Sequence, residues 1–424
     1  MKRFSFVLML ALMMCACVNE DNYNLSSKID DVESFSISPN EAASIALDFA
    51  SALRNGEETR SVNQSILRVH NVQPLKSRNI MTRSENKGNE LCIDTLLYVV
   101  NFSDEQGFAL VAADKRTTPI YAIADSGSLD FDNLRSEENV GFLLFLEGAI
   151  GKIVQDVNTN DAIETRATTN GWTIIEKYPA MLKTKWDQTD PYNMYCPNNR
   201  YTGCTVTATA QILSYYQTIG SVSWSDNGSS GSATLNWSRI ISDCEKNYGE
   251  LNTTSYYASS SEVAHLMRYL GVAMDADYDA DGTGVNKKKP INWMNDWGGL
   301  NATKLADYSA SPIINAIKSN KLVYARGNSG RKKFLGITVS YTGGHAWVYD
   351  GYVSASSGGT TSNLLHCNWG WGGYQDGYYI SGAFNSDAGA EIYDWEVTRS
   401  NEGTTDEGSD GNYQYNLEYS IVSR

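Results

Sequence analysis

Apolar positions recur every three or four residues in the stretch from Tyr201 to Tyr216, at Val206, Ala210, Leu213 and Tyr216. This spacing places them on one face of a helix that packs against a core. Gly203 and Cys204 come just before the first of these positions, where such a helix would begin. The pattern therefore predicts a buried helix with Cys204 at its N-terminus.

Strand patterns dominate the later part of the chain. They predict antiparallel strands at 321–326, around His345, around Asn368 and at 415–422. Earlier, Ser259 and Glu262 are spaced as the capping box of a further helix. The serine- and glycine-rich stretch 354–363 is expected to be a flexible connection between two of the strands. Helices first and strands second predict a domain with a helical half and a β half.

A separate small α+β unit is expected before this domain. Ser38 and Glu41 form a capping box with a proline between them, and the apolar face of the helix that follows carries Ile45, Phe49 and Leu53. Strand patterns follow at 66–69, 96–102, 108–112 and 120–123, and a helical pattern covers 140–157. Residues 157–171 are polar and lack periodicity, which predicts a cleavable linker.

The first 17 residues have the pattern of an export signal. Lys2 and Arg3 precede an apolar run that is too short to span a membrane. The run ends in Cys15, Ala16 and Cys17, which resembles the lipobox of bacterial lipoproteins with Cys17 as the lipidated residue and Cys15 as a rival acceptor. We therefore expect the protein to be exported, and lipid-anchored or secreted.

Composition and charge narrow the class of partner. The chain has 424 residues and is 42% hydrophobic, which is enough for two domains with cores of their own. Its net charge of −15 argues against nucleic acid and against an anionic membrane surface as partners.

Five residues form a candidate catalytic set. A cysteine at a helix N-terminus, such as Cys204, meets unpaired N–H groups and the positive end of the helix dipole, and both favour a nucleophilic thiolate. His345 lies far later in the chain, after two glycines, as expected of a general base supplied by a sheet. The Asn368 amide could accept the imidazole N–H of that base, with the indole of Trp369 keeping water away. Gln188 could donate to the oxyanion of a tetrahedral intermediate.

The other histidines, the other cysteines and an acidic loop indicate no further catalytic or metal site. His70, His265 and His366 lack the surroundings expected of a catalytic base. Scattered spacing predicts free thiols rather than a disulfide framework at Cys92, Cys196, Cys244 and Cys367, although three pairings are open. The acidic loop 277–288 begins like an EF-hand, but its twelfth position is Lys288 where calcium needs a glutamate. We therefore expect neither a metal nor a cofactor.

The blocks WDQTDPYN, GCTVTATAQILSYY, GGHAWVYDGY and NWGWGGYQDGYY, in this order, resemble the signature blocks of the streptopain family of papain-fold bacterial cysteine endopeptidases, which are made as zymogens. The resemblance implies Cys204 as nucleophile, His345 as general base and acid, and Gln188 as oxyanion donor, with Asn368 and Trp369 orienting and shielding the histidine. It also places a glycine-rich loop beside the substrate groove, and the expected substrate-binding residues are Gly282, Thr283, Gly284 and Gly344. Separately, the segment GFALVAADKRTTPIYAIADSGSL resembles the propeptide and inhibitor module of these enzymes.

The expected architecture is an α+β, papain-like catalytic domain at 167–424 preceded by a signal at 1–17 and a propeptide domain at 18–166. The expected activity is hydrolysis of peptide bonds after removal of the prodomain, which acts as an intramolecular inhibitor. Two alternatives remain open: an amidase or transamidase with the same residues, and a non-catalytic surface lipoprotein that binds glycans or proteins through its ten tryptophans and twenty-six tyrosines.

Overall fold

The computed structural model describes residues 35–55, 67–76, 81–82, 93–131, 140–159, 171–279, 282–327, 333–334, 337–338, 344–384, 392–393 and 417–424. The predicted signal at 1–17, with Cys15 and Cys17, and Cys92 lie outside these residues. Residues from Ser36 onward form one compact unit. Within the part of the chain described, no helix has the length and apolar character needed to cross a membrane.

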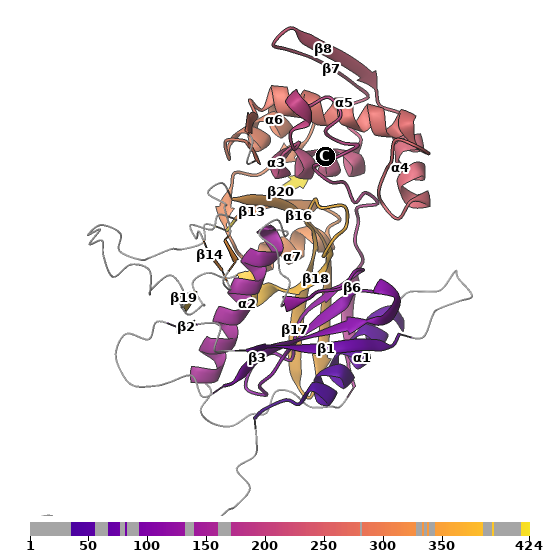
Figure 1. Ribbon diagram of the computed structural model, residues 1–424. Helices are drawn as coiled ribbons and strands as arrows, with labels where there is room; N and C mark the ends of the chain where they lie inside the picture. The colour runs from indigo at the N-terminus through magenta and orange to yellow at the C-terminus, as the bar shows by residue number, and fades with distance from the viewer. Residues whose placement is uncertain are drawn as a thin grey trace, which may run out of the picture. The chain divides into compact units, whose positions relative to one another are not determined.

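The N-terminal part is a sheet flanked by two helices (Figure 1). Its elements are α1 (Pro39–Asn55), β1 (Val69–Lys76), β2 (Met81–Thr82), β3 (Thr95–Phe102), the short helix η2 (Ser103–Glu105), β4 (Phe108–Ala112), β5 (Ile120–Ala124) and α2 (Val140–Thr159). The predicted capping box is present at the start of α1, where the Ser38 N–H donates to Glu41 Oε2 at 2.8 Å and the Glu41 N–H donates to Ser38 Oγ at 3.3 Å. Helix α1 packs on β1, β3 and β4.

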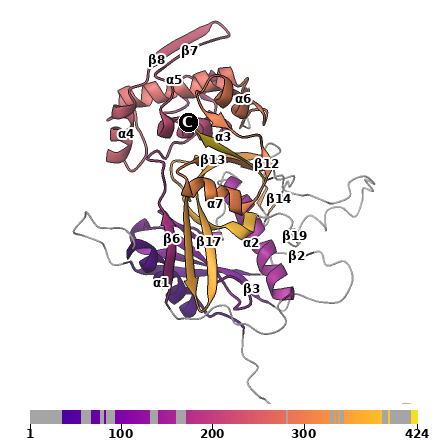
Figure 2. The same cartoon turned by 180° about the vertical axis from the view of Figure 1, so that it is seen from behind.

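The middle of the chain is mainly helical. It contains β6 (Thr173–Tyr178), η4 (Pro197–Asn199), α3 (Cys204–Tyr216), β7 (Ser221–Asp226), β8 (Ser229–Thr234), α4 (Trp237–Lys246), α5 (Tyr257–Ala273), β9 (Asp277–Asp279), β10 (Gly282–Gly284) and α6 (Lys289–Asp296). Helices α3 to α6 lie together with the β7–β8 hairpin in both views (Figures 1 and 2). Helix α3 packs against α5 and α6 on one side and against strands β13 and β16 on the other.

Strands dominate the last part of the chain. They are β11 (Asn301–Ala302), β12 (Ala306–Asp307), β13 (Leu322–Gly327), β14 (Lys333–Phe334), β15 (Ile337–Thr338), β16 (His345–Ser357), β17 (Thr360–Asn368), β18 (Gly377–Ile380), β19 (Ile392–Tyr393) and β20 (Glu418–Ser423), with α7 (Ala310–Lys318) and η5 (Ser381–Phe384) between them. The main sheet has the order β1-β3-β4-β5-β18-β17-β16-β13-β20-β11, so the N-terminal strands continue directly into the C-terminal ones through β5 and β18.

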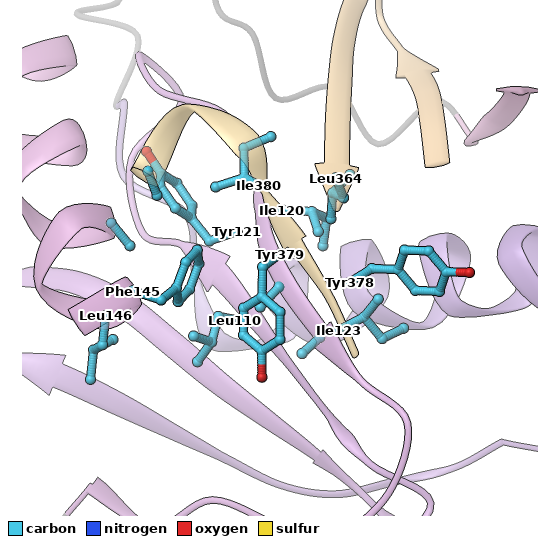
Figure 3. Packing of buried hydrophobic residues seen from close by; sticks show 14 of the residues in the cluster. Leu110, Ile120, Tyr121, Ile123, Phe145, Leu146, Leu364, Tyr378, Tyr379 and Ile380 are labelled. Atoms are coloured by element: carbon cyan, nitrogen blue, oxygen red, sulfur yellow. The ribbon is translucent and has the colours of Figure 1, made fainter. Parts of the chain in front are cut away.

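Two apolar cores lie on the two faces of strand β16. The first, which we call the shared core, combines residues of the N-terminal part with Trp347, Tyr349 and Trp369. The second, the helical-half core, contains Ala346 and Val348 together with the buried side of α3. Figure 3 shows part of the shared core, where Phe145 of α2 meets Tyr379 of β18 at a ring separation of 4.7 Å. Because side chains alternate along a strand, neighbouring β16 residues enter different cores.

Several boundaries differ from those that the sequence predicts. Helix α5 begins at Tyr257, and the Ser259 hydroxyl donates to Asp243 while the Glu262 carboxylate accepts from the Asn236 N–H, so these residues do not form a capping box. The stretch 354–363 is not a flexible connection, because β16 and β17 pair through it as far as Ser357 and Thr360. The first predicted strand lies later than expected, at Val69–Lys76.

Candidate active site

The predicted nucleophile, Cys204, is the first residue of α3. Gly203 before it has φ +92°, a conformation that L residues with side chains rarely adopt. The Gln188 carbonyl accepts the Thr202 N–H at 2.9 Å, which ties the expected oxyanion donor to the turn that leads into the helix. Gln188 and Cys204 thus lie on adjoining segments, as their expected roles require.

The expected substrate-binding loop lies beside this turn. A Cβ atom on Gly203 would be 2.9 Å from the Thr283 carbonyl oxygen, so only a glycine fits beneath the loop. The Thr283 hydroxyl donates to the Tyr201 carbonyl at 2.5 Å. Thr283 lies in β10 between Gly282 and Gly284, and β10 pairs with β9. The acidic loop is therefore a hairpin next to the nucleophile, and the described residues hold no cluster suited to a metal ion.

The expected base, His345, is the first residue of β16 and is 3% exposed. Its ring stacks on Trp347, two residues on, with centroids 6.2 Å apart and planes at 13°. Nε2 of His345 lies 2.9 Å from the carbonyl oxygen of Trp369. Trp347 belongs to the shared core, so the imidazole lies on the face of β16 opposite to the face on which α3 packs.

Helix α2 of the N-terminal part covers His345. A Cβ atom on Gly141 would lie 2.7 Å from His345 Cδ2 and 2.4 Å from Trp369 Cε3. Two turns later, a Cβ atom on Gly148 would lie 2.0 Å from the carbonyl oxygen of Ala383. These two glycines, seven residues apart on one helix face, allow α2 to approach the C-terminal part more closely than any side chain would permit.

Asn368 does not hydrogen-bond to His345 in this structure. Its Oδ1 accepts from Gln211 Nε2 at 2.5 Å and from the Gly370 N–H at 3.3 Å, and its Nδ2 donates to the Thr184 carbonyl at 2.9 Å. Asn368 pairs with Val348 across the sheet and faces α3. The indole of Trp369 is fully buried on the other side, in the shared core. It is the backbone carbonyl of Trp369, and not the amide of Asn368, that contacts the imidazole.

Comparison with known proteins identifies both parts of the chain. Residues 186–379 match the Peptidase C10 family and residues 34–147 match the Spi protease inhibitor family. The chain belongs to the peptidase C10 family. Residues 34–147 are its inhibitor module, and we call the N-terminal part up to Thr159, which includes α2, the prodomain.

Relatives of this C10 peptidase share both parts. Streptopain of Streptococcus pyogenes serotype M28 (strain MGAS6180) is 28% identical over 342 residues, which are 72% of this chain and 78% of streptopain. The thiol protease/hemagglutinin PrtT of Porphyromonas gingivalis is 24% identical over 327 residues, covering 69% of this chain and 34% of PrtT. The structure of a mutant prointerpain A fragment from Prevotella intermedia has the same fold, with a TM-score of 0.51 at 20% identity over 81% of this chain and 98% of the fragment.

The family match confirms several expectations. This C10 peptidase is a cysteine protease made as a proenzyme with an N-terminal inhibitor prodomain, and its fold is the expected α+β, papain-like one. The amidase and the non-catalytic alternatives are therefore wrong. The roles of Cys204, His345, Gln188, Asn368 and Trp369, and the substrate-binding role of Gly282, Thr283, Gly284 and Gly344, remain predictions.

The remaining cysteines and histidines take structural positions. Cys196, Cys204, Cys244 and Cys367 are free of disulfides, as expected. Burial raises the pKa of the Cys196 thiol to about 11 and that of Cys244 to about 12, which keeps both protonated and unreactive. His265 stacks on Tyr195 at 3.9 Å and contacts the Trp224 indole N–H through Nδ1 at 3.1 Å.

His366 holds a position that the sequence did not suggest. Its Nδ1 lies 2.6 Å from Asp350 Oδ1, and its Nε2 lies 3.2 Å from Asp125 Oδ2 of the prodomain. Burial alone would lower the pKa of His366, but the carboxylates of Asp350 and Asp125 outweigh it and raise the pKa well above the ordinary value. His366 is therefore a charged group at the contact between prodomain and catalytic part, and the spacing of histidines gave no signal for it.

Proposed function

We propose that this cysteine protease is an endopeptidase in which Cys204 attacks the peptide carbonyl and His345 acts first as general base and then as general acid. Gln188 and the Cys204 N–H stabilise the oxyanion of the tetrahedral intermediate, and water finally releases the acyl group from the sulfur. The observation that carries the proposal is the packing of α3, which begins with Cys204, against β16, which begins with His345.

In the proenzyme, the imidazole has to be kept from the thiol. His345 stacks on Trp347, its Nε2 faces the Trp369 carbonyl, and Gly141 of α2 leaves no room above it. We infer that the prodomain maintains latency by holding His345 on the α2 face of the sheet. Removal of α2 frees this side of the ring, so that the imidazole can turn towards α3 and form the thiolate–imidazolium pair.

Cleavage within 157–171 separates the prodomain from a catalytic domain at 167–424 in this proposal. Strand β6, which follows that stretch, pairs with β16 and therefore stays with the catalytic domain. The polar composition of the stretch supports the cleavage. Protein and peptide substrates follow from the protease activity. Export through the signal at 1–17 and lipidation at Cys17 remain part of the proposal on the sequence alone.

The experiment compares the wild-type full chain with Cys204→Ala and with Cys196→Ala, a control in which a different thiol, a buried one, is removed. Wild type and Cys196→Ala should shorten and then hydrolyse casein, and an epoxide that alkylates thiols should block both. Cys204→Ala should do neither without added protease, because loss of the nucleophile costs several orders of magnitude in rate. Equal casein turnover by Cys204→Ala would refute the proposal.

A further inference from the structure

One buried amide connects the three segments that carry the proposed catalytic groups. Gln211 lies on α3 seven residues after Cys204, two turns along the same helix face, and is fully buried. Its Oε1 accepts from the Thr184 hydroxyl and from the Trp186 N–H, both at 3.2 Å. Its Nε2 donates to Asn368 Oδ1 at 2.5 Å.

The orientation of this amide is fixed by its partners. The Trp186 N–H can only donate, so the atom of Gln211 that faces it is the oxygen. Asn368 Nδ2 faces the Thr184 carbonyl, which can only accept, so Asn368 presents its oxygen to Gln211. The Gly370 N–H donates to that same oxygen. Flipping either amide would bring donor against donor or acceptor against acceptor.

Each of the joined segments leads directly to a catalytic position. Trp186 is two residues before Gln188, the proposed oxyanion donor. Asn368 is followed by Trp369, whose carbonyl faces His345. The helix that carries Gln211 begins with Cys204. Gln211 therefore holds the nucleophile helix, the segment that leads to Gln188 and the segment beside the histidine at fixed separations, without being exposed to substrate.

We propose that Gln211 is a positioning residue for catalysis, and that its side-chain amide sets the alignment of Cys204, Gln188 and the Asn368–Trp369 segment. The proposal rests on the proposed function, because it assumes the roles given there. A shift of about 1 Å in such an alignment can cost on the order of 10²-fold in rate. A purely structural role would instead lower stability and leave the turnover of the folded enzyme unchanged.

The test uses full chains that carry Gln211→Leu, Gln211→Glu or Ser214→Ala. Ser214 is the matched control. Its hydroxyl bonds to the Thr184 hydroxyl at 3.1 Å and donates to the backbone carbonyl of Gln211 at 2.6 Å, so it belongs to the same network but has no bond to Trp186 or Asn368. Trace wild-type protease, later removed, processes every variant. A thiol-directed inhibitor titrates the active sites, and kcat and KM on a peptide substrate are measured beside the Tm.

We expect Gln211→Leu to lower kcat about 100-fold with little change in KM, and Ser214→Ala to keep kcat near the wild-type value even where its Tm falls equally. Gln211→Glu keeps the shape of the side chain, but an ionised carboxylate cannot donate to Asn368 Oδ1. Its kcat should therefore fall as the pH rises and recover at acid pH, where the carboxyl is protonated and donates again.

The positioning role is overturned if Gln211→Glu has the pH profile of wild type, a result that stays informative even where Gln211→Leu does not fold. It is also overturned if Ser214→Ala and Gln211→Leu lose kcat in equal proportion to their loss of Tm. Failure of the proposed function is distinct from both outcomes. It appears as turnover by Cys204→Ala, and the positioning role then falls with it.

Discussion

Two of the contacts between the prodomain and the catalytic part are of opposite character. At the first, Gly141 of α2 packs on His345 and Trp369 through apolar surface alone. At the second, the Asp125 carboxylate reaches buried His366 at 3.2 Å and lies 3.7 Å from Lys185 Nζ. The first contact covers the proposed base and involves no charge on the prodomain. The second lies away from that base and depends on the protonation of its members.

We therefore expect the first contact to block the proposed base and the second to influence release of the prodomain. In the proposed mechanism, packing around Gly141 determines whether His345 can move, and this packing should change little with pH. The Asp125 contact contributes to docking only while its groups are charged, and backbone pairing of β5 with β18 adjoins it. Variants at the two contacts should therefore differ both in the size of their effect and in its dependence on pH.

The largest effect is expected for Gly141→Ala. The added Cβ atom would lie 2.4 Å from Trp369 Cε3, which is carbon and part of a fully buried ring, so α2 has to move away. Overpacking of this kind costs about 1–3 kcal/mol, which corresponds to roughly 5- to 150-fold in an equilibrium. The full chain should mature faster by about this factor, as measured by its rate of shortening and of peptide turnover.

Gly220→Ala is the control for this variant, because a Cβ atom there meets nothing within 4 Å. It should mature at the wild-type rate. If Gly141→Ala stayed as latent as wild type, the α2 contact would not be what holds His345, and the comparison between the two contacts would lose its first half.

The sequence predicted elements better than it predicted contacts. The helix beginning at Cys204 and the strand Phe108–Ala112 have the bounds expected of them, because each has a clear apolar pattern that begins directly after a glycine, Gly203 or Gly107. The strands through 354–363 were missed, since serine, glycine and threonine are typical of loops and only pairing with the neighbouring strand makes them extended.

For the site, the sequence identified which residue types could act but not which face of a sheet they occupy. Cys204 and His345 have motif signals, and the side of β16 on which the imidazole lies is determined by packing against Gly141, 204 residues earlier in the chain. Gln211 had no signal beyond a polar residue inside an apolar helix pattern. Asp125 had none, because its partner His366 comes 241 residues later.

A smaller, pH-dependent effect is expected for Asp125→Asn. Burial opposes ionisation of Asp125, but the charges of His366 and Lys185 outweigh it and lower its pKa below 3.8. Asp125 therefore stabilises docking of the prodomain above its ordinary pKa, and this stabilisation is lost as the pH falls through the lowered pKa. The raised pKa of His366 gives a contribution that is complete below 6.5 and is lost as the pH rises through the raised value.

Both contributions are complete in the wild type between about pH 4 and pH 6.5. The Asp125→Asn substitution should therefore weaken docking of the prodomain most in that window. We expect roughly 5- to 30-fold, since Asp125 is 35% exposed and solvent screens part of the pair. Hydrogen exchange of the β18 amides in a Cys204→Ala background, corrected for intrinsic rates, measures the opening. Asp104→Asn removes the same charge at an exposed position of η2 and should change nothing. A difference that does not vary with pH would contradict the charged character of this contact.

The smallest effect is expected for Asp376→Asn, which tests how far the charged contact extends. Burial raises the pKa of Asp376 to about 7, and Asp125 raises it further while Lys185, the Trp369 N–H and His366 lower it. Its Oδ1 accepts the Trp369 N–H at 2.8 Å, and its backbone carbonyl accepts the Asp125 N–H at 2.8 Å. Asparagine keeps the side-chain acceptor but does not ionise.

Because the folded protein holds the Asp376 proton to a higher pH than the unfolded chain does, wild type loses stability as the pH rises from about 4 to about 7. The variant should therefore gain about 2–4 °C in Tm over wild type at pH 8 and nothing at pH 4, measured by thermal unfolding in the Cys204→Ala background. Asp307→Asn, at an exposed position, is the control and should show no such trend. An equal Tm difference at both pH values would mean that Asp376 is already ionised in the folded protein, and that the charged contact ends at Asp125, His366, Asp350 and Lys185.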